Sequence, residues 1–220
     1  MAKVREIYVS WRSGKGARRR LVGSIKRSAN DGITFRYLEA GAKTAEKEGF
    51  TGYTGFPLDY KVIYEERDLD IFSLRLTPFE RKENPKVLRF WEAEGVTDKF
   101  ELLALTQGLL PTDNYEFLGI FYPDKGFRFV TDIAGLSHTE VKVGSIKSGD
   151  SIDYLLEDNE HAFKGKAVKL LKAGNAIGYI KNVHNSIFLD SKAKLKLTVK
   201  EVEENGIVKN IFLTVDSSYS

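Results

Sequence analysis

The sequence predicts an α+β protein, mainly β, built from two units. The first is a small β-sheet or barrel with helices at residues 1–122, and the second is a small β-barrel at residues 127–216. Short segments rich in β-branched and aromatic residues recur along the chain between turn residues. Most helix signals fall in the first unit. Tyr122-Pro123-Asp124-Lys125-Gly126 separates two aromatic runs and is the best candidate boundary.

The elements of the first unit follow from local patterns. A basic hairpin is expected at its start, because alternating segments flank the turn Ser13-Gly14-Lys15-Gly16. Thr97-Asp98 favours a capped helix, and Asn84-Pro85 is a second helix start. The predicted strands are 7–11, 21–26, 33–38, 60–64 and 117–121, and the predicted helices are 40–47, 86–94 and 99–106. Residues 69–76 fit either a helix or a strand.

The second unit reads as six short strands, a spacing typical of a small closed barrel or sandwich. The predicted strands are 127–136, 152–156, 167–171, 176–180, 195–199 and 208–215. Asn205-Gly206 is the strongest hairpin signal in the chain, because both residues tolerate a positive φ. A short helix is expected at 183–189.

Composition excludes several function classes. The chain of 220 residues has no cysteine, which excludes disulfides, thiolate nucleophiles and Cys-type zinc sites. No apolar run reaches the roughly 18–20 residues that span a bilayer, and the first residues lack the apolar core of a secretory signal. We therefore expect a cytoplasmic protein with no membrane partner.

Charge is distributed unevenly, although the net charge is only +3. Residues 3–27 contain nine basic residues and one acid, Glu6. The basic residues are Lys3, Arg5, Arg12, Lys15, Arg18, Arg19, Arg20, Lys26 and Arg27. Arg18, Arg19 and Arg20 at the hairpin are predicted to touch phosphates or an acidic partner, with a solvated turn as the alternative. Gly14-Lys15-Gly16 lacks the spacing and the following helix of a P-loop.

Neither a metal site nor a catalytic site is predicted. His138, His161 and His184 have no ligand spacing and no cysteine beside them. His184 is expected at the surface or at a helix cap, and His161 in a long turn that faces a ligand. The carboxylates form no recognisable acid–base constellation, and kinase loop signatures are absent. The sequence predicts a non-enzymatic protein without cofactors.

Basic and aromatic residues alternate in the second unit, a pattern that suits single-stranded nucleic acid. The alternative is a solvated strand edge guarded by lysines. The candidate DNA contacts here are His138, His161, Phe163, Lys164, Lys166, Lys169 and Lys181.

Residues 127–215 resemble a HIRAN domain. The resemblance rests on Phe129 to Leu136, Gly149-Asp150, Glu157, Asn159, Ala167-Val168 and Ile177-Gly178-Tyr179-Ile180. It implies a small β-barrel that binds nucleic acid. Where members that bind strand ends carry an aromatic residue and a Tyr-Asp pair, this chain has Ser137-His138 and His161-Ala162. The resemblance therefore implies general DNA contact more than capture of a strand end.

The first unit resembles the N-terminal subdomain of HipA-like kinases, which also occurs as the free antitoxin HipS. The matching segments are 21–25, 33–38, 56–58, 71–76, 100–103 and 108–113. The resemblance implies a domain that docks on a HipA-like Ser/Thr kinase supplied by another chain. The candidate docking residues are Arg75, Arg89, Trp91, Leu110, Thr112 and Asp113. Phe90, beside Trp91, is expected in the core.

The leading hypothesis is a bacterial antitoxin or regulatory subunit that inhibits a HipA-like kinase, with DNA and a helix-turn-helix protein as further partners. The first alternative is a DNA-binding module for repair or processing. The second is a scaffold whose basic hairpin binds an acidic partner.

Overall fold

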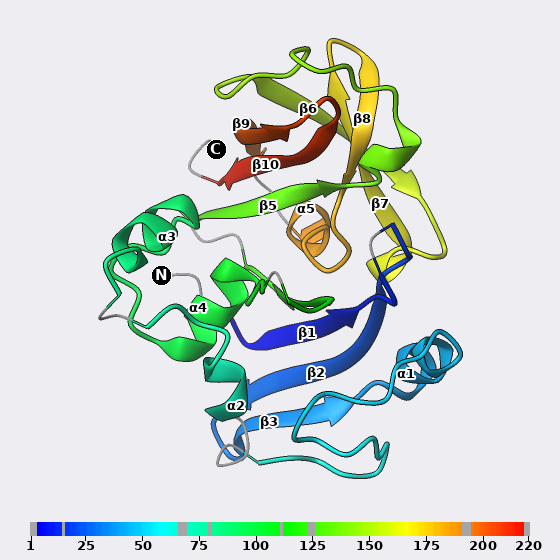
Figure 1. The fold of residues 1–220 in the computed structure, drawn as a ribbon, viewed down its shortest axis with the longest axis vertical. Helices are drawn as coiled ribbons and strands as arrows, with labels where there is room; N and C mark the ends of the chain where they lie inside the picture. Colours follow the sequence, from blue (N-terminus) through cyan, green and yellow to red (C-terminus); the bar gives the residue numbers. More distant parts are fainter. Residues whose placement is uncertain are drawn as a thin grey trace. The chain divides into compact units, whose positions relative to one another are not determined.

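The computed structural model describes residues 4–14, 16–65, 70–78, 81–110, 112–122, 126–190 and 195–217 (Figure 1). The chain forms two compact units, Val4–Ile120 and Phe121–Ser220. Three residues of the predicted boundary, Pro123, Asp124 and Lys125, lie outside the described residues, as does Lys15 of the basic hairpin.

The first unit contains a four-stranded antiparallel sheet with the order β3-β2-β1-β4. Its strands are β1 (Glu6–Trp11), β2 (Arg20–Ser28), β3 (Gly32–Tyr37) and β4 (Tyr115–Gly119). Four predicted strands are thus confirmed. The strand predicted at 60–64 is wrong, because only Tyr64 pairs there, through two 2.9 Å backbone hydrogen bonds with Phe35.

The described residues of this unit also form the helices α1 (Glu39–Glu46), α2 (Asp70–Ser73), α3 (Asn84–Phe90) and α4 (Lys99–Thr106). The three predicted helices are confirmed, and residues 70–73 resolve the ambiguity of 69–76 in favour of a helix; Leu69 lies outside the described residues. Asp98 caps α4 by accepting hydrogen bonds from the amides of Phe100 and Glu101. α1 approaches β2 so closely that a Cβ on Gly41 would lie 1.9 Å from the Leu21 carbonyl oxygen.

Aromatic residues build the core of the first unit. Phe35 on β3 packs against Phe56 and Phe72, with ring centroids 5.2 and 5.4 Å away. The Tyr37 hydroxyl donates to the Phe56 carbonyl at 2.6 Å and accepts from the Tyr53 amide at 2.8 Å. Burial raises the pKa of Tyr37 to about 12, so the hydroxyl stays protonated and keeps both bonds at neutral pH. These contacts fix the irregular residues 50–58 on the sheet.

The second unit is a closed barrel of six strands in the order β10-β5-β8-β7-β6-β9. The strands are β5 (Arg128–Ala134), β6 (Ser151–Asp158), β7 (Lys166–Lys172), β8 (Asn175–Ile180), β9 (Lys196–Glu204) and β10 (Val208–Asp216). All six predicted strands and the hairpin at Asn205-Gly206 are confirmed. The predicted short helix is also present, as α5 (Ser186–Asp190).

The barrel interior is apolar, with Phe129, Val168, Leu170, Ile211 and Leu213 at most 1% exposed. Gly178 is the residue that allows β5 and β8 to pair closely. Its φ is +134°, and a Cβ there would lie 2.4 Å from the Ile133 side chain and 2.6 Å from the Ala134 carbonyl oxygen. The glycine of Ile177-Gly178-Tyr179-Ile180 is thus required by backbone approach.

Candidate functional site

The turn of residues 159–165, between β6 and β7, carries the exposed basic and aromatic side chains that the sequence singled out. It is closed by its own hydrogen bonds, from the Asn159 amide to the Gly165 carbonyl at 3.0 Å and from the His161 amide to Asn159 Oδ1 at 3.0 Å. Lys164 has a left-handed backbone, with φ 58°. The side chain of His161 is 64% exposed, and Lys164 is exposed as well.

Two asparagines after β8 hold this turn in place. The Phe163 amide donates to Asn182 Oδ1 at 3.2 Å. Asn185, which is 1% exposed, donates from Nδ2 to the Phe163 carbonyl at 2.9 Å and the Lys166 carbonyl at 2.6 Å. The backbone is therefore anchored on both sides of Lys164. Sequence reasoning missed both asparagines, because in the sequence they read only as turn residues.

The outer face of β6, β7 and β8 places a lysine and a tyrosine beside a carboxylate. Leu155, Lys169 and Tyr179 lie opposite one another in the strand register, so their side chains share one face. Lys169 Nζ lies 3.5 Å from Glu157 Oε2. A hydrogen bond to Glu157 raises the pKa of Tyr179. Lys166 pairs similarly with Asp158 at 2.6 Å.

These pairs lie near solvent and hold the lysines only weakly. The side chains of Lys166 and Lys169 are 46% and 34% exposed. Exposed ion pairs contribute about 0–1 kcal/mol, so a phosphate can replace the carboxylate at small cost. His138 is also exposed, at the end of a turn of residues Leu136–His138 that lies next to β8. The structure thus brings together the predicted contacts on the 159–165 turn and on β7, which directly follows it. His138 lies apart from them, because β5 runs antiparallel to β8 and leads away from Asn182 and the turn.

Lys181 was predicted to contact DNA, and its position corrects that prediction. It is 2% exposed and forms an ion pair with Asp132 on β5. A buried ammonium in an ion pair is a structural group, because moving it to a ligand would leave Asp132 charged and buried.

His184 was expected at the surface or at a helix cap; the surface location is wrong, and the residue lies two positions before the start of α5. It is 1% exposed, its Nδ1 lies 2.9 Å from Thr131 Oγ1, and its ring packs on Phe121 and Phe129. Between Lys181 and His184, the fully buried Val183 has φ 75°, an unusual conformation for a β-branched residue. The segment that anchors the 159–165 turn is therefore held by its own buried contacts.

The arginines of the basic hairpin are mostly engaged within the first unit. Arg19 forms an ion pair with Glu116, and Arg20 Nε donates to Glu48 Oε1 at 3.1 Å. The hydrogen bond from Arg20 lowers the pKa of Glu48. Of the three arginines predicted to bind phosphates, Arg18 is the exposed one. Because the ion pairs of Arg19 and Arg20 are partly exposed, the prediction that the three arginines contact phosphates stays a prediction, with Arg18 the most accessible of them.

Arg75 is a buried organiser of the first unit and does not present its guanidinium to a partner. It is 7% exposed. Its Nε donates to the Gly108 carbonyl at 2.8 Å, and Nη1 and Nη2 reach the two carboxylate oxygens of Asp113 at 2.7 Å each. The guanidinium also lies 4.9 Å from the centre of the Phe117 ring. Arg75 thus joins the end of α2 to the loop of residues 108–113.

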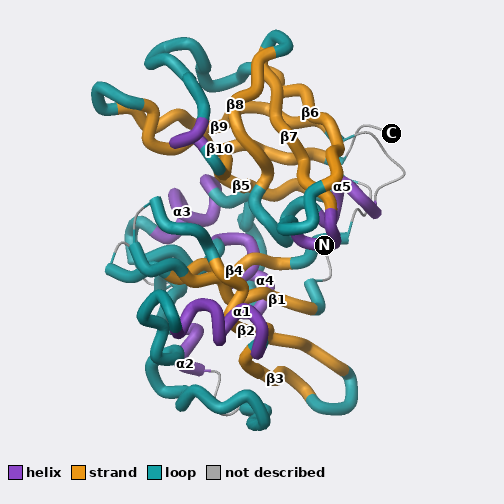
Figure 2. The backbone as a smooth tube through the Cα atoms, turned by 90° about the vertical axis from the view of Figure 1, so that its right-hand side faces the viewer, coloured by secondary structure: helices purple, strands orange, loops and turns teal. Residues whose placement is uncertain are grey.

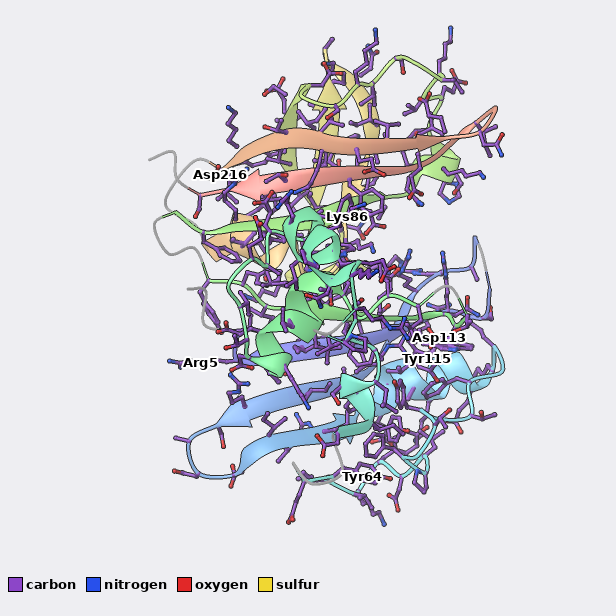
Figure 3. The ribbon with its side chains drawn as sticks, turned by 60° about the vertical axis from the view of Figure 1, so that its left-hand side comes forward. Arg5, Tyr64, Lys86, Asp113, Tyr115 and Asp216 are labelled. Atoms are coloured by element: carbon purple, nitrogen blue, oxygen red, sulfur yellow. The ribbon has the colours of Figure 1, made fainter. Side chains whose placement is uncertain are left out.

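Three leucines and a threonine beside this buried link are exposed in full or in part. Leu74 and Leu109, which flank the hydrogen bond from Arg75 to Gly108, are 78% and 37% exposed. Leu110 is partly exposed and Thr112 exposed. Asp113 lies beside Tyr115 and accepts from its amide at 3.1 Å (Figure 3). We call Leu74, Leu109, Leu110 and Thr112 the leucine patch; Pro111 lies outside the described residues.

The two candidate docking residues at the end of α3, Arg89 and Trp91, differ in exposure. Arg89 is exposed, with its Nε 3.3 Å from Glu94. Trp91 is only 9% exposed, and its ring meets Phe90 edge-on at 5.1 Å. Trp91 therefore belongs to the core, which corrects its assignment as a docking residue. The more exposed ring of the two is Phe90, the reverse of the expectation.

A pocket of about 260 Å³ lies between the sheet of the first unit and helices α2 and α4. Ile25, Ile33, Phe72 and Leu103 give it an apolar lining. At its rim Arg27 makes two 2.7 Å hydrogen bonds to Asp98. The volume is below the range of drug-sized ligand sites. Nothing in the sequence pattern marked this pocket.

Within the part of the chain that the structure describes, no group of three or more His, Asp or Glu side chains is placed to hold a metal ion, and no helix is long and apolar enough to cross a membrane. The sequence matches no family model, and neither a curated protein nor a solved structure matches it.

Proposed function

We propose that the chain is a non-catalytic regulatory subunit of the antitoxin type. In this proposal the first unit binds and inhibits a HipA-like Ser/Thr kinase, and the HIRAN-like barrel contacts DNA. A helix-turn-helix protein is a further partner of such an assembly.

The observation that carries the proposal is how the segments resembling HipA meet in the fold. Segments 33–38, 56–58, 71–76 and 108–113 are far apart in sequence. They converge on one core through Phe35, Phe56 and Phe72 and through the bond from Arg75 to Gly108. Such convergence is what a resemblance in fold requires, since the matching segments then belong to one core.

The leucine patch is the surface that fits the proposed docking. Arg75 holds the Gly108 carbonyl before the patch residues and the Asp113 carboxylate after them, so these two points are fixed before a partner binds. Exposed apolar side chains that lie close together are a common feature of protein interfaces. The partner is expected to cover Leu74 and Leu109 with apolar side chains.

Co-expression with a HipA-like kinase tests the proposal. The wild-type chain is expected to relieve the growth defect caused by the kinase and to co-purify with it. Leu74→Asp should weaken both effects, because a carboxylate would be buried without a partner. Ile207→Asp is the matched control, since Ile207 is a 65% exposed residue of the second unit. If the wild-type chain neither relieves the growth defect nor co-purifies with the kinase, the proposal is rejected.

The alternative function is a DNA-binding module that works without a kinase. The observation in its favour is the 159–165 turn, whose anchored backbone presents His161 and Lys164 to solvent. A salt titration of binding to single-stranded and duplex DNA separates the two proposals. Tight, salt-dependent binding to DNA by a chain that does not bind the kinase would favour this alternative.

The contribution of the lysines on the 159–165 turn and β7 to DNA binding can be tested by substitution. Replacing Lys164, Lys166 and Lys169 by alanine should remove up to three phosphate contacts. The slope of log affinity against log salt for single strands should then flatten by about 2. Lys209→Ala, a change of an exposed lysine on β10, should leave the slope unchanged. An unaltered slope in the triple variant would reject this surface.

A further inference from the structure

The pocket of the first unit has an apolar floor. Ile25, Phe72 and Leu103 form this floor, and each of them is at most 5% exposed. Ile25 lies on β2 opposite Phe35 of β3 in the strand register, while Phe72 comes from α2 and Leu103 from α4. The two strands and the two helices can be followed in Figure 2. The floor is therefore built from the same core as the rest of the unit.

The volume of the pocket indicates the size of the group that it can hold. An apolar protein cavity of about 150 Å³ binds benzene. The pocket here has a volume of about 260 Å³, and Phe100 adds a second aromatic side chain to its lining. The cavity therefore has room for one aromatic ring with a short arm that reaches the solvent.

Among the described residues, the charged side chains that line the pocket are two acids and two bases. Arg27 and Asp98 neutralise each other through two 2.7 Å hydrogen bonds. Asp70, the first residue of α2, and Lys99, the first residue of α4, are both exposed. A ligand with a single charge would therefore meet one opposite charge and one like charge at this rim. A ligand with both charges would find an opposite charge for each.

We propose that this pocket binds a free α-amino acid whose side chain is apolar and about the size of that of phenylalanine. The side chain enters the cavity against Ile25, Phe72 and Leu103, where its burial supplies affinity. The ammonium of the amino acid faces Asp70, and its carboxylate faces Lys99. Both charges stay at the rim, so they keep much of their contact with water and avoid the cost of burying an ion. This inference does not depend on kinase binding or on DNA binding.

Calorimetric titration of the full chain with L-phenylalanine tests the proposal. The Kd should be on the order of 10⁻⁴ M, as suits a ligand of about a dozen non-hydrogen atoms. Hydrocinnamate, which lacks the ammonium, and phenethylamine, which lacks the carboxylate, should each bind at least about tenfold more weakly. Free glycine, which has no side chain to bury, should not bind. Absence of L-phenylalanine binding at millimolar concentrations, or equal binding of the three aromatic compounds, would overturn the proposal.

Substitutions at the rim show which side chain recognises which charge. Asp70→Asn should weaken L-phenylalanine binding about tenfold and remove its advantage over hydrocinnamate, whereas Lys99→Gln should weaken it as much and remove its advantage over phenethylamine. Both residues are exposed, so both variants should fold. The matched controls are Lys86→Gln and Glu140→Gln, which change an exposed base and an exposed acid outside the pocket lining and should bind like the wild type. Unchanged ligand preferences in both rim variants would contradict the proposed contacts.

The position of the bound amino acid is tested separately by NMR on the full chain. The ring protons of L-phenylalanine should show nuclear Overhauser effects to the methyl groups of Ile25, Ile33 and Leu103, which line the cavity. The methyl groups of Ile207, an exposed residue of the second unit, should show none. Effects confined to methyl groups outside the pocket would overturn the assignment of the site, even if the amino acid binds.

Discussion

Arg75 in the first unit and Lys181 in the second are both buried cations paired with an aspartate, and they are satisfied in different ways. Arg75 spreads its charge over the Gly108 carbonyl, the Tyr53 hydroxyl and Asp113. Lys181 directs its ammonium at Asp132. The guanidinium is a fixed fork with five donors, whereas the ammonium is a compact point charge. Arg75 therefore joins several segments of the first unit, and the ion pair of Lys181 links the residue after β8 to β5.

The two buried cations also support different candidate contact surfaces. The network of Arg75 positions the loop that carries the leucine patch. The pair of Lys181 lies at the start of the segment whose Asn182 and Asn185 anchor the 159–165 turn. The Arg75 pair thus supports the leucine patch, and the Lys181 pair supports the segment that anchors the 159–165 turn. Four predictions test this comparison, from the largest expected effect to the smallest.

Replacement of Arg75 by methionine should cost about 3–5 kcal/mol of unfolding free energy, because Asp113, Tyr53 and Gly108 all lose a donor. Chemical denaturation followed by tyrosine and tryptophan fluorescence measures this. Arg75→Met combined with Asp113→Leu should recover little, since the Gly108 carbonyl stays unsatisfied. Full recovery in the double variant would mean that Arg75 is an isolated ion pair.

Replacement of Lys181 by methionine should cost about 3 kcal/mol, because Asp132 is then buried without its ammonium. Here the double variant Lys181→Met with Asp132→Leu should regain most of the loss, since a buried ion pair is readily replaced by apolar residues of similar volume. Failure to recover would place Lys181 in a wider network like that of Arg75.

Asn185→Ala should loosen the 159–165 turn at a cost of about 2 kcal/mol, because two carbonyls lose the same donor. Hydrogen exchange of the amides in residues 159–166 should accelerate while the amides of β5 remain protected. Equal acceleration in β5 would indicate that Asn185 supports the whole barrel.

Asp98 provides an exposed ion pair for comparison with the two buried ones. The hydrogen bond from Arg27 lowers the pKa of Asp98. Its contribution is therefore complete above the unfolded pKa of about 3.9 and is lost as pH falls through the lower folded pKa. Because Asp98 is 40% exposed and asparagine also caps helices, Asp98→Asn should cost only about 0.5–1 kcal/mol at pH 7.

Urea denaturation of the wild type and of Asp98→Asn at pH 7 and at about pH 3 measures this contribution. The difference between the two proteins should shrink at the lower pH. A difference that stays constant would show that the carboxylate charge does not contribute.

Local patterns predicted most of the fold but little of the site. The six barrel strands, the hairpin at Asn205-Gly206 and the cap at Asp98 follow from turn chemistry and alternation, which are properties of neighbouring residues. The burial of Lys181, Arg75 and Trp91 depends on partners brought together by the tertiary fold, such as Asp132 on β5. Basic residues were therefore predicted to be surface contacts, because a sequence displays charge but not the buried acid that neutralises it.

Asn182 and Asn185 illustrate the same point for the candidate site. Their donors and acceptors act on a turn about twenty residues earlier, which no local pattern reveals.

A titration of the purified full chain against a HipA-like kinase tests the central claim most directly. Calorimetry should give a Kd in the range of about 10⁻⁶ M or tighter, weakened at least tenfold by Leu74→Asp and unchanged by Ile207→Asp. No heat of binding at micromolar concentrations, or equal affinities for the wild type and Leu74→Asp, would contradict the assignment of the first unit as a kinase-docking domain through its leucine patch.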